Sequence, residues 1–391
     1  MISYQRINSY LLFLTLFFAS LANHTGITVI IAAIFSFILF YTSGSFRRIN
    51  KITLFIFSIS LLFIIVSSIL FLVNIPTYNP DQEFQDAFIS NFIKYLFLSI
   101  FIFTFSCYVR SASTKTLLKN FNALILVHVT LFFIQFIIVY STGNYIDFIE
   151  PITQEQSRYL FYGAITTINL YRCTGLFVEP STYAVSIFAL FCILSTIDKE
   201  KQYRKTCYLA ISSIFLTLSS IAFILLAIYF FFKMMKNKKI IFTIIPIIII
   251  SLFYFSDFIQ TQINKIENTS GIRVNLVSAI LDRPTSLLLS GSGLYAVEEH
   301  IMQGSRGFCP DNTDCSTSIN RSYASPTDSG LLFYLFIKFG VLTPFILLLI
   351  CYPFINDREK IISFSCILLT KIQFAFPLLW LLIIIFRRKK T

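Results

Sequence analysis

Long apolar runs follow one another along the chain, and short polar segments separate them. Runs such as 53–73 and 89–109 carry at most one charge each, and at about 20 residues they are long enough to cross a bilayer as helices. Six further runs have the same character: 8–22, 27–43, 120–141, 181–197, 240–256 and 330–353. The pattern predicts an all-α polytopic membrane protein that forms a single integral membrane domain over residues 1–391.

Two more apolar segments, 206–232 and 361–386, have basic residues at both ends. Each holds about 26 residues, fewer than two spans of roughly 20 residues would need. We therefore expect each to turn back as a short hairpin, spanning or re-entrant, at Ser219–Ser220 and at Lys371 to Pro377. Irregular backbone at membrane depth requires protein or water around it, so the hairpins should pack inside a bundle of about 12 spans.

Basic side chains gather in short clusters at the ends of the apolar runs. The chain has 31 Lys and Arg against 19 Asp and Glu, a net charge of +12. The clusters lie at residue 6 and within 47–51, 110–119, 199–205, 233–239, 358–360 and 387–390. Short basic loops stay on the cytoplasmic side of a membrane, so we expect all these clusters and both termini to be cytoplasmic. This topology explains the positive charge, and no nucleic-acid partner is expected.

The first run also has features of a secretory signal peptide, because Arg6 precedes it and small residues follow at Ala19–Ala22. Its removal would leave the run 27–43 to start on the outer side. We expect the first run to be retained as a membrane anchor, as is usual in proteins that cross the membrane several times.

Two long polar segments, 142–180 and 257–329, interrupt the apolar pattern. On the topology that the basic clusters predict, both are large external loops. Loops of this length seldom persist without a binding or catalytic role. We therefore expect the chemistry of the protein to lie there.

The first loop ends in YRCTGLFVEPSTYA, residues 171–184. Arg172 offers planar donors suited to phosphate or carboxylate, and Gly175 permits a close approach of the backbone. Glu179 stands directly before a proline at a predicted helix start, where an acidic side chain is favourable. In the alternative interpretation, Glu179 and Ser181 only cap the helix, and Arg172 binds lipid headgroups.

The second loop contains GIRVNLVSAILDRP (271–284), followed by LLLSGSGLY (287–295). Arg273 precedes apolar residues at helical spacing, which predicts an amphipathic helix on the membrane surface. Gly291 and Gly293 could form a turn that approaches a phosphate, although a single G-x-G is more often an ordinary loop.

Two charged residues stand where this loop meets the next apolar run. Asp328 opens the run, and partial burial would raise the pKa of its carboxyl and make it a useful base. It also has the position and residue type of a helix N-cap. Lys338 lies about ten residues deeper, where a charged side chain is a functional candidate unless it reaches the interface or an internal partner.

Cysteine positions give a second indication that this loop is external. Cys309 and Cys315 bracket the segment CPDNTDC, whose turn residues would bring the two side chains together as a disulfide. Such a bond needs an oxidising compartment; two free thiols are the alternative. The three histidines stand on separate segments, so neither a metal site nor a cofactor is expected.

Taken in this order, the segments resemble the O-antigen polymerase (Wzy) family and its relatives, the O-antigen ligases. The matched features are Arg172 with the following G-L-F-x-E-P-S, Arg273 before a helix leading to L-L-L-S-G-S-G, and Asp328 opening a span that ends in Gly-Val. The resemblance extends loosely over the whole chain. It implies a GT-C-like glycosyltransferase of the bacterial inner membrane that joins undecaprenyl-diphosphate-linked oligosaccharides on the periplasmic face. Membrane lipids and a chain-length regulator protein are the other partners it implies.

The candidate residues fit that chemistry. Breaking a sugar–diphosphate bond develops negative charge on the leaving diphosphate, which the guanidinium groups of Arg172 and Arg273 can stabilise without a metal. The acceptor hydroxyl must lose a proton, for which Asp328 is the first candidate base and Glu179 the second. Attack opposite the leaving group predicts inversion at the anomeric carbon.

Three alternatives remain open. Ligases of the resembled superfamily typically present a histidine where this chain has Asp328, which favours the polymerase over the ligase. A flippase for lipid-linked oligosaccharides would explain Lys338, but not the arginines of the long loops, because transporters bind their substrates near the bilayer midplane. A structural scaffold would leave the arginines unused.

Overall fold

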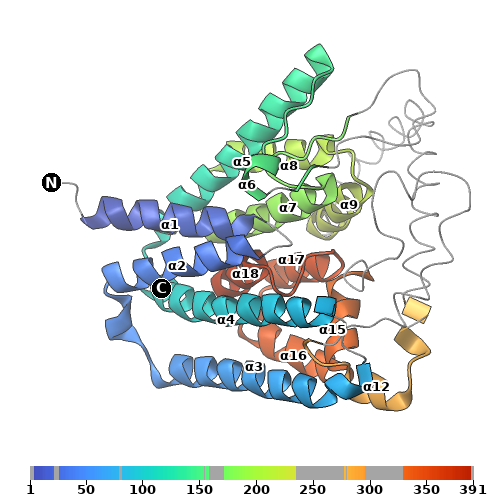
Figure 1. Ribbon diagram of the computed structural model, residues 1–391. Helices are drawn as coiled ribbons and strands as arrows, with labels where there is room; N and C mark the ends of the chain where they lie inside the picture. Colours follow the sequence, from blue (N-terminus) through green and yellow to red (C-terminus); the bar gives the residue numbers. More distant parts are fainter. Residues whose placement is uncertain are drawn as a thin grey trace, which may run out of the picture.

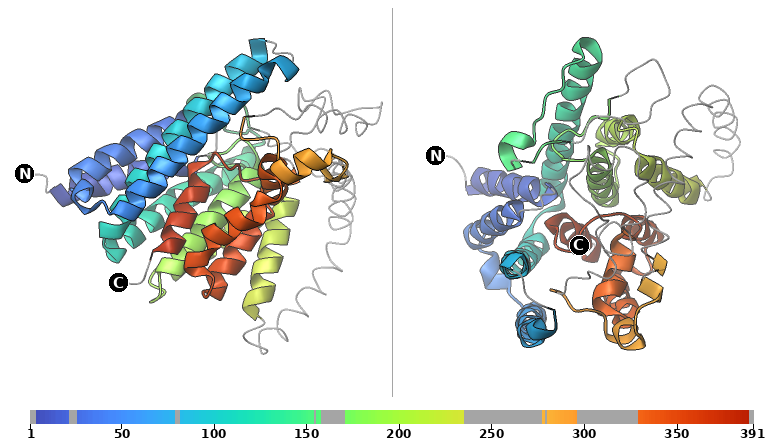
Figure 2. Two further views of the ribbon diagram at one scale, coloured as in Figure 1. Left: turned by 90° about the horizontal axis from the view of Figure 1, so that it is seen from below. Right: turned by 45° about the vertical axis from the view of Figure 1, so that its right-hand side comes forward.

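The computed structural model describes residues 4–21, 26–78, 82–153, 155–157, 171–234, 277–278, 280–295 and 329–388. Every regular element within these ranges is a helix, which confirms the all-α prediction for them. The helices run side by side as a bundle, with α2 lying against both α1 and α4 (Figures 1 and 2).

The described helices have the following bounds: α1 Tyr4–Ser20, α2 Ile27–Thr42, η1 Ser45–Arg48, α3 Lys51–Tyr78, α4 Gln82–Ser111, α5 Thr114–Thr142, α6 Glu150–Thr153, α7 Pro180–Ile197, α8 Arg204–Leu216, α9 Ser220–Met234, α12 Thr285–Ser290, α15 Leu331–Phe339, α16 Leu342–Cys351, η4 Tyr352–Phe354, α17 Arg358–Leu368 and α18 Pro377–Arg387. Each predicted apolar run within the described ranges falls largely on one helix, except 330–353, which is divided. The run 240–256 lies outside those ranges.

Three stretches in the described part are long and apolar enough to cross a membrane: Phe88–Ser111 of α4, Thr114–Thr142 of α5 and Pro180–Ile197 of α7. Shorter apolar stretches cover Ile27–Thr42, Thr53–Ile69, Ser220–Phe232, Leu342–Phe354 and Pro377–Arg387. These helices mark the chain as a membrane protein. A total of about 12 spans stays a prediction.

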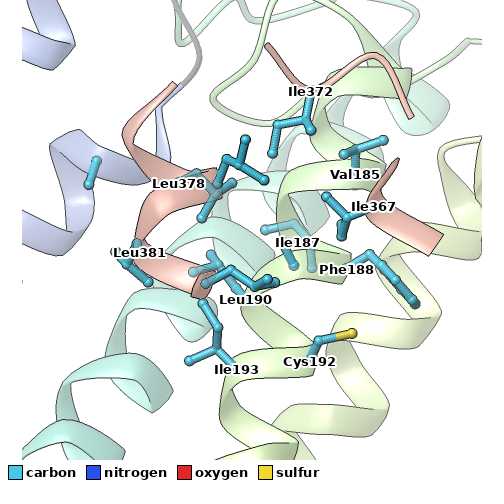
Figure 3. Close-up of a cluster of buried hydrophobic side chains, with 14 of the residues drawn as sticks. Val185, Ile187, Phe188, Leu190, Cys192, Ile193, Ile367, Ile372, Leu378 and Leu381 are labelled. Atoms are coloured by element: carbon cyan, nitrogen blue, oxygen red, sulfur yellow. The ribbon is translucent and has the colours of Figure 1, made fainter. Parts of the chain in front are cut away.

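Helix α7 is the most enclosed of the three. Every side chain from Tyr183 to Leu194 is buried. A helix that is buried on all its faces is expected where protein rather than water surrounds it. Figure 3 shows side chains of α7, such as Ile187, facing Ile367 of α17 and Leu378 of α18. The first long loop therefore leads into the centre of the bundle.

The first predicted hairpin is present. α8 ends at Leu216 and α9 begins at Ser220, with Leu218 in a left-handed conformation between them (φ 51°). The ring of Tyr229, late in α9, lies 5.3 Å from that of Phe191 in the second half of α7. The chain thus returns toward the end from which α8 set out, and the turning point predicted at Ser219–Ser220 is confirmed.

The second predicted hairpin is present as well. α17 and α18 are separated by residues 369–376, which include the predicted turn at Lys371. The ammonium of Lys360, early in α17, donates a hydrogen bond to the carbonyl of Phe386, late in α18, over 2.7 Å. The two helices are therefore antiparallel.

The basic ends of several helices meet at one end of the bundle. Arg388, after α18, donates to the carbonyl of Ala112, between α4 and α5, over 2.7 Å. Asn120, near the start of α5, donates to Ser9 of α1 over 3.2 Å, and Thr206 at the start of α8 donates to an asparagine of α5 over 2.6 Å. A shared basic end is what the predicted topology requires. The side of the membrane that it faces stays a prediction.

One expectation is wrong. The sequence predicts a single span over 330–353, but the structure divides this run into α15 and α16 at Gly340 and Val341. Gly340 has a positive φ of 51°, a conformation that only glycine adopts freely. Apolar residues continue on both sides of the break, so hydropathy alone did not indicate it.

Candidate functional site

The first loop folds back on itself directly after α5. Gly143 ends the helix in a left-handed conformation, and Asp147 then organises the next turn. One carboxylate oxygen of Asp147 accepts from the backbone amides of Ile149 and Glu150, at 3.0 and 3.1 Å, and the other accepts from the amide of Ser157 at 2.7 Å. Asp147 therefore has a structural role in this part of the loop.

Gln135 joins the two ends of the loop. Its side chain is fully buried in α5, and its Nε2 donates to the carbonyl of Ile146 over 2.8 Å. Its Oε1 accepts from the amides of Thr174 and Gly175 at 2.9 and 2.8 Å. Sequence analysis missed this residue, although a lone glutamine inside an apolar run is itself a signal, because a buried amide needs partners.

Two tyrosines hold the segment that contains Arg172. The hydroxyl of Tyr140, on α5, donates to the carbonyl of Tyr171 over 2.9 Å. The hydroxyls of Tyr145 and Thr174 lie 2.7 Å apart and share a hydrogen bond. Arg172 thus stands between residues that are fixed on each side.

Arg172 and Glu179 lie within electrostatic reach of each other. Burial lowers the pKa of the Arg172 guanidinium from its ordinary value, and the charge of Glu179 opposes this shift. Glu179 occupies the N-cap position of α7, but its side chain makes no capping hydrogen bond. Its carboxylate instead accepts from the hydroxyl of Ser181 over 3.0 Å. Side-chain capping is therefore not what Glu179 and Ser181 do here.

Gly175 is explained by packing. Its φ is 57°, and a Cβ at this position would come within 2.9 Å of the ring of Tyr183. That ring stacks on Phe132 of α5 with centroids 4.7 Å apart. The close approach predicted for Gly175 is thus made to the core, and it lets the segment after Arg172 lie flat against α5 and α7.

Gly291 and Gly293 lie against the end of α15. The amides of Ser292 and Gly293 donate to the carbonyls of Ile337 and Lys338 at 2.9 and 3.0 Å. The amide of Gly291 donates to Leu287 within its own turn. These backbone donors are already used within the protein and are not available to a phosphate. A substrate-binding role for Gly291 and Gly293 stays a prediction.

Arg283 completes this contact, and no sequence pattern had indicated it. The side chain is buried; it donates to the carbonyl of Ile337 over 3.1 Å and to the hydroxyl of Ser292 over 2.5 Å. The break at Gly340 leaves the last carbonyls of α15 without helical donors. Arg283 and Ser292 donate hydrogen bonds to one of these carbonyls, that of Ile337. A cation at this helix end is also favoured by the helix dipole.

Lys338 lies buried in the last turn of α15, with 5% of its surface exposed. Its ammonium lies 5.6 Å from the centre of the Tyr334 ring, within range of a cation–π attraction. Tyr95 of α4 shares a side-chain hydrogen bond with Tyr334 and interacts electrostatically with Lys338. The lysine therefore points into the bundle among phenols, and the snorkelling alternative is wrong.

Four predicted site residues lie outside the described residues: Arg273, Cys309, Cys315 and Asp328. Ser329, which follows Asp328 in the chain, is buried, and Leu331 donates its amide to the carbonyl of Thr370 over 2.7 Å. In the described ranges no three His, Cys, Asp or Glu side chains gather as metal ligands would. Comparison of the chain with known protein families, curated proteins and solved structures finds no match.

Proposed function

We propose that the chain is an O-antigen polymerase of the bacterial inner membrane. It joins undecaprenyl-diphosphate-linked oligosaccharide repeat units by inverting glycosyl transfer on the periplasmic face, with both of its termini in the cytoplasm. A chain-length regulator protein is a further expected partner. The proposal combines the family resemblance of the sequence with the arrangement around Arg172.

The observation that carries the proposal is the fixed position of Arg172 at the outer end of α7. Its neighbours in the chain are held by Tyr140 on one side and by Gln135 and Tyr145 on the other. An arginine whose backbone is held in this way has less freedom to move when negative charge develops nearby, which favours its use as a fixed cation that stabilises a transition state. Its planar donors suit a diphosphate better than a lysine would.

The remaining roles follow from the chemistry of the reaction. Arg172 and Arg273 bind the diphosphate of the donor and stabilise it as the sugar–oxygen bond breaks. The acceptor hydroxyl attacks the anomeric carbon from the opposite side and gives its proton to a carboxylate, with Asp328 as first candidate and Glu179 as second. The lipid-linked diphosphate leaves with the bonding electron pair.

The lipopolysaccharide of cells that lack the gene tests this function. A core that carries a single repeat unit indicates a polymerase, since ligation and transport continue without it. A core without any attached polysaccharide indicates a ligase or a flippase and contradicts the proposal. Complementation with the wild-type gene should restore the ladder of long chains.

One observation favours a second candidate, a flippase for lipid-linked oligosaccharides. Transporters bind substrates at discontinuous helices near the bilayer midplane, and the buried Lys338 lies next to the break between α15 and α16. Lys338→Met separates the two functions. A flippase predicts loss of all attached polysaccharide in this variant, whereas a polymerase predicts that single repeat units still reach the core.

A further inference from the structure

We infer that Gln135 is a positioning residue for Arg172. The inference rests on the proposed function, in which Arg172 binds the donor diphosphate. Gln135 is a polar residue among apolar neighbours on α5, and its side chain is fully buried. It holds backbone atoms from both ends of the first loop at once: the carbonyl of Ile146 and the amides of Thr174 and Gly175.

The side-chain amide is well matched to this place. Its oxygen has two lone pairs for the two backbone amides, and its nitrogen donates to the carbonyl. An apolar side chain of the same size would leave the two buried amides and the carbonyl of Ile146 without these bonds. Asparagine is one carbon shorter, so its amide could not reach from α5 to both ends of the loop in the same way.

The bonds of Gln135 act close to Arg172 and leave the packing of the helices to other residues. Thr174 and Gly175 lie two and three positions after Arg172 in the chain. α5 is joined to the Gly175 region and to α7 by aromatic contacts, including Phe132 on Tyr183 at 4.7 Å and His128 on Phe177 at 5.4 Å. Removal of the amide should therefore shift the segment around Arg172 while the bundle stays assembled.

Three variants test the inference in purified protein supplied with lipid-linked repeat units. Gln135→Met keeps the length of the side chain and removes all three bonds. Gln135→Glu keeps them only when the carboxyl is protonated, because it must then donate to Ile146. Asn120→Leu is the matched control, since Asn120 is a buried polar residue of the same helix that bonds to Ser9 and Thr116 at the other end.

We expect the turnover number of Gln135→Met to fall by roughly 10-fold to 100-fold at an equal amount of folded protein, because small displacements of a catalytic group cost about this much. Asn120→Leu should keep its turnover within about twofold of wild type even if its melting temperature falls, since it lies far from the loop. Equal turnover in Gln135→Met and wild type would overturn the inference. The inference would also be overturned if turnover fell in both Gln135→Met and Asn120→Leu only in proportion to the amount of folded protein lost.

The glutamate variant gives a readout that a purely structural role would not move. Its turnover relative to wild type should rise as the pH is lowered from about 8 to about 6, because the protonated carboxyl restores the bond to Ile146. The titratable residues of the loop, such as Tyr145, Cys173 and Arg172, are the same in both proteins, so the ratio reports mainly on the introduced carboxyl. A ratio that is constant with pH would contradict the role of the donated bond.

Failure of the inference and failure of the proposed function give different results. If purified wild-type protein forms no polymer, the proposed function fails. If wild type forms polymer and Gln135→Met does so equally well, only the positioning role of Gln135 fails.

Discussion

The ammonium of Lys360 donates to the backbone carbonyl of Phe386 over 2.7 Å, and both groups lie at the same end of the bundle. Lys360 is 9% exposed and also lies 3.8 Å from the carboxylate of Asp357. Lys360 joins the two ends of the hairpin formed by α17 and α18. Its positive charge interacts favourably with the dipole at the C-terminal end of α18.

Lys360→Met should lower the free energy of unfolding by about 1–3 kcal/mol, because a buried carbonyl then loses a charged donor. Arg358→Met is the matched control, since Arg358 is an exposed cation two residues away. Thermal unfolding in detergent measures both. Equal stability of the two variants would show that the bond to Phe386 contributes nothing.

The topology makes a prediction that reporter fusions check. Fusions after Tyr78, Ile152 and Gly304 should read periplasmic, and a fusion after Arg388 should read cytoplasmic, because basic clusters stay inside. A cytoplasmic signal at Gly304 would contradict the proposed site, since both long loops must face the same side to form it.

The contact between the 283–293 segment and α15 predicts a difference between two glycines. A Cβ at Gly291 would collide with the carbonyl of Lys338, whereas no atom of the described residues lies within 4 Å of a Cβ at Gly293. Both residues have a positive φ, so alanine at either position costs on the order of 1–3 kcal/mol in backbone strain. Gly291→Ala should be further destabilised by the collision, and equal melting temperatures for the two alanine variants would contradict the observed docking.

The helices were largely predictable because burial in a membrane leaves long apolar runs. The ends of the runs 27–43 and 181–197 agree closely with α2 and α7, whereas α4 and α5 begin six or seven residues before their runs. The turns at Ser219–Ser220 and after Lys371 were predictable because basic residues at both ends left too little chain for two full spans. The break at Gly340 was not, because apolar residues continue across it and the segment around Arg283 that bonds to the end of α15 is distant in the chain.

The candidate site was predictable only in part. Arg172, Gly175 and Glu179 stand in one short motif, so local spacing indicated that they lie near one another. Gln135 lies 37 positions before Arg172 in the chain, and no local motif marks it; only the fold brings its amide to Thr174. The motif also could not indicate that Gly175 approaches Tyr183 rather than a ligand.

Two isosteric variants, Asp328→Asn and Glu179→Gln, test which carboxylate is the base. Asp328→Asn keeps the shape of the side chain and can still cap a helix, but it cannot accept the proton of the acceptor hydroxyl. Loss of polymer at a normal protein level, with the donor still bound, is the expected result. Full activity would eliminate Asp328 and move the role to Glu179, which Glu179→Gln tests in the same assay.

Polymer formation by purified protein from lipid-linked repeat units is the most direct measurement of whether Arg172 binds the donor diphosphate in glycosyl transfer. Wild type should extend the chains, and Arg172→Ala should form no long polymer. Arg172→Lys keeps the charge but loses the planar pair of donors, so its rate should fall on the order of 10²-fold. Absence of polymer with wild type, or a wild-type rate for Arg172→Lys, would contradict the proposed role of Arg172.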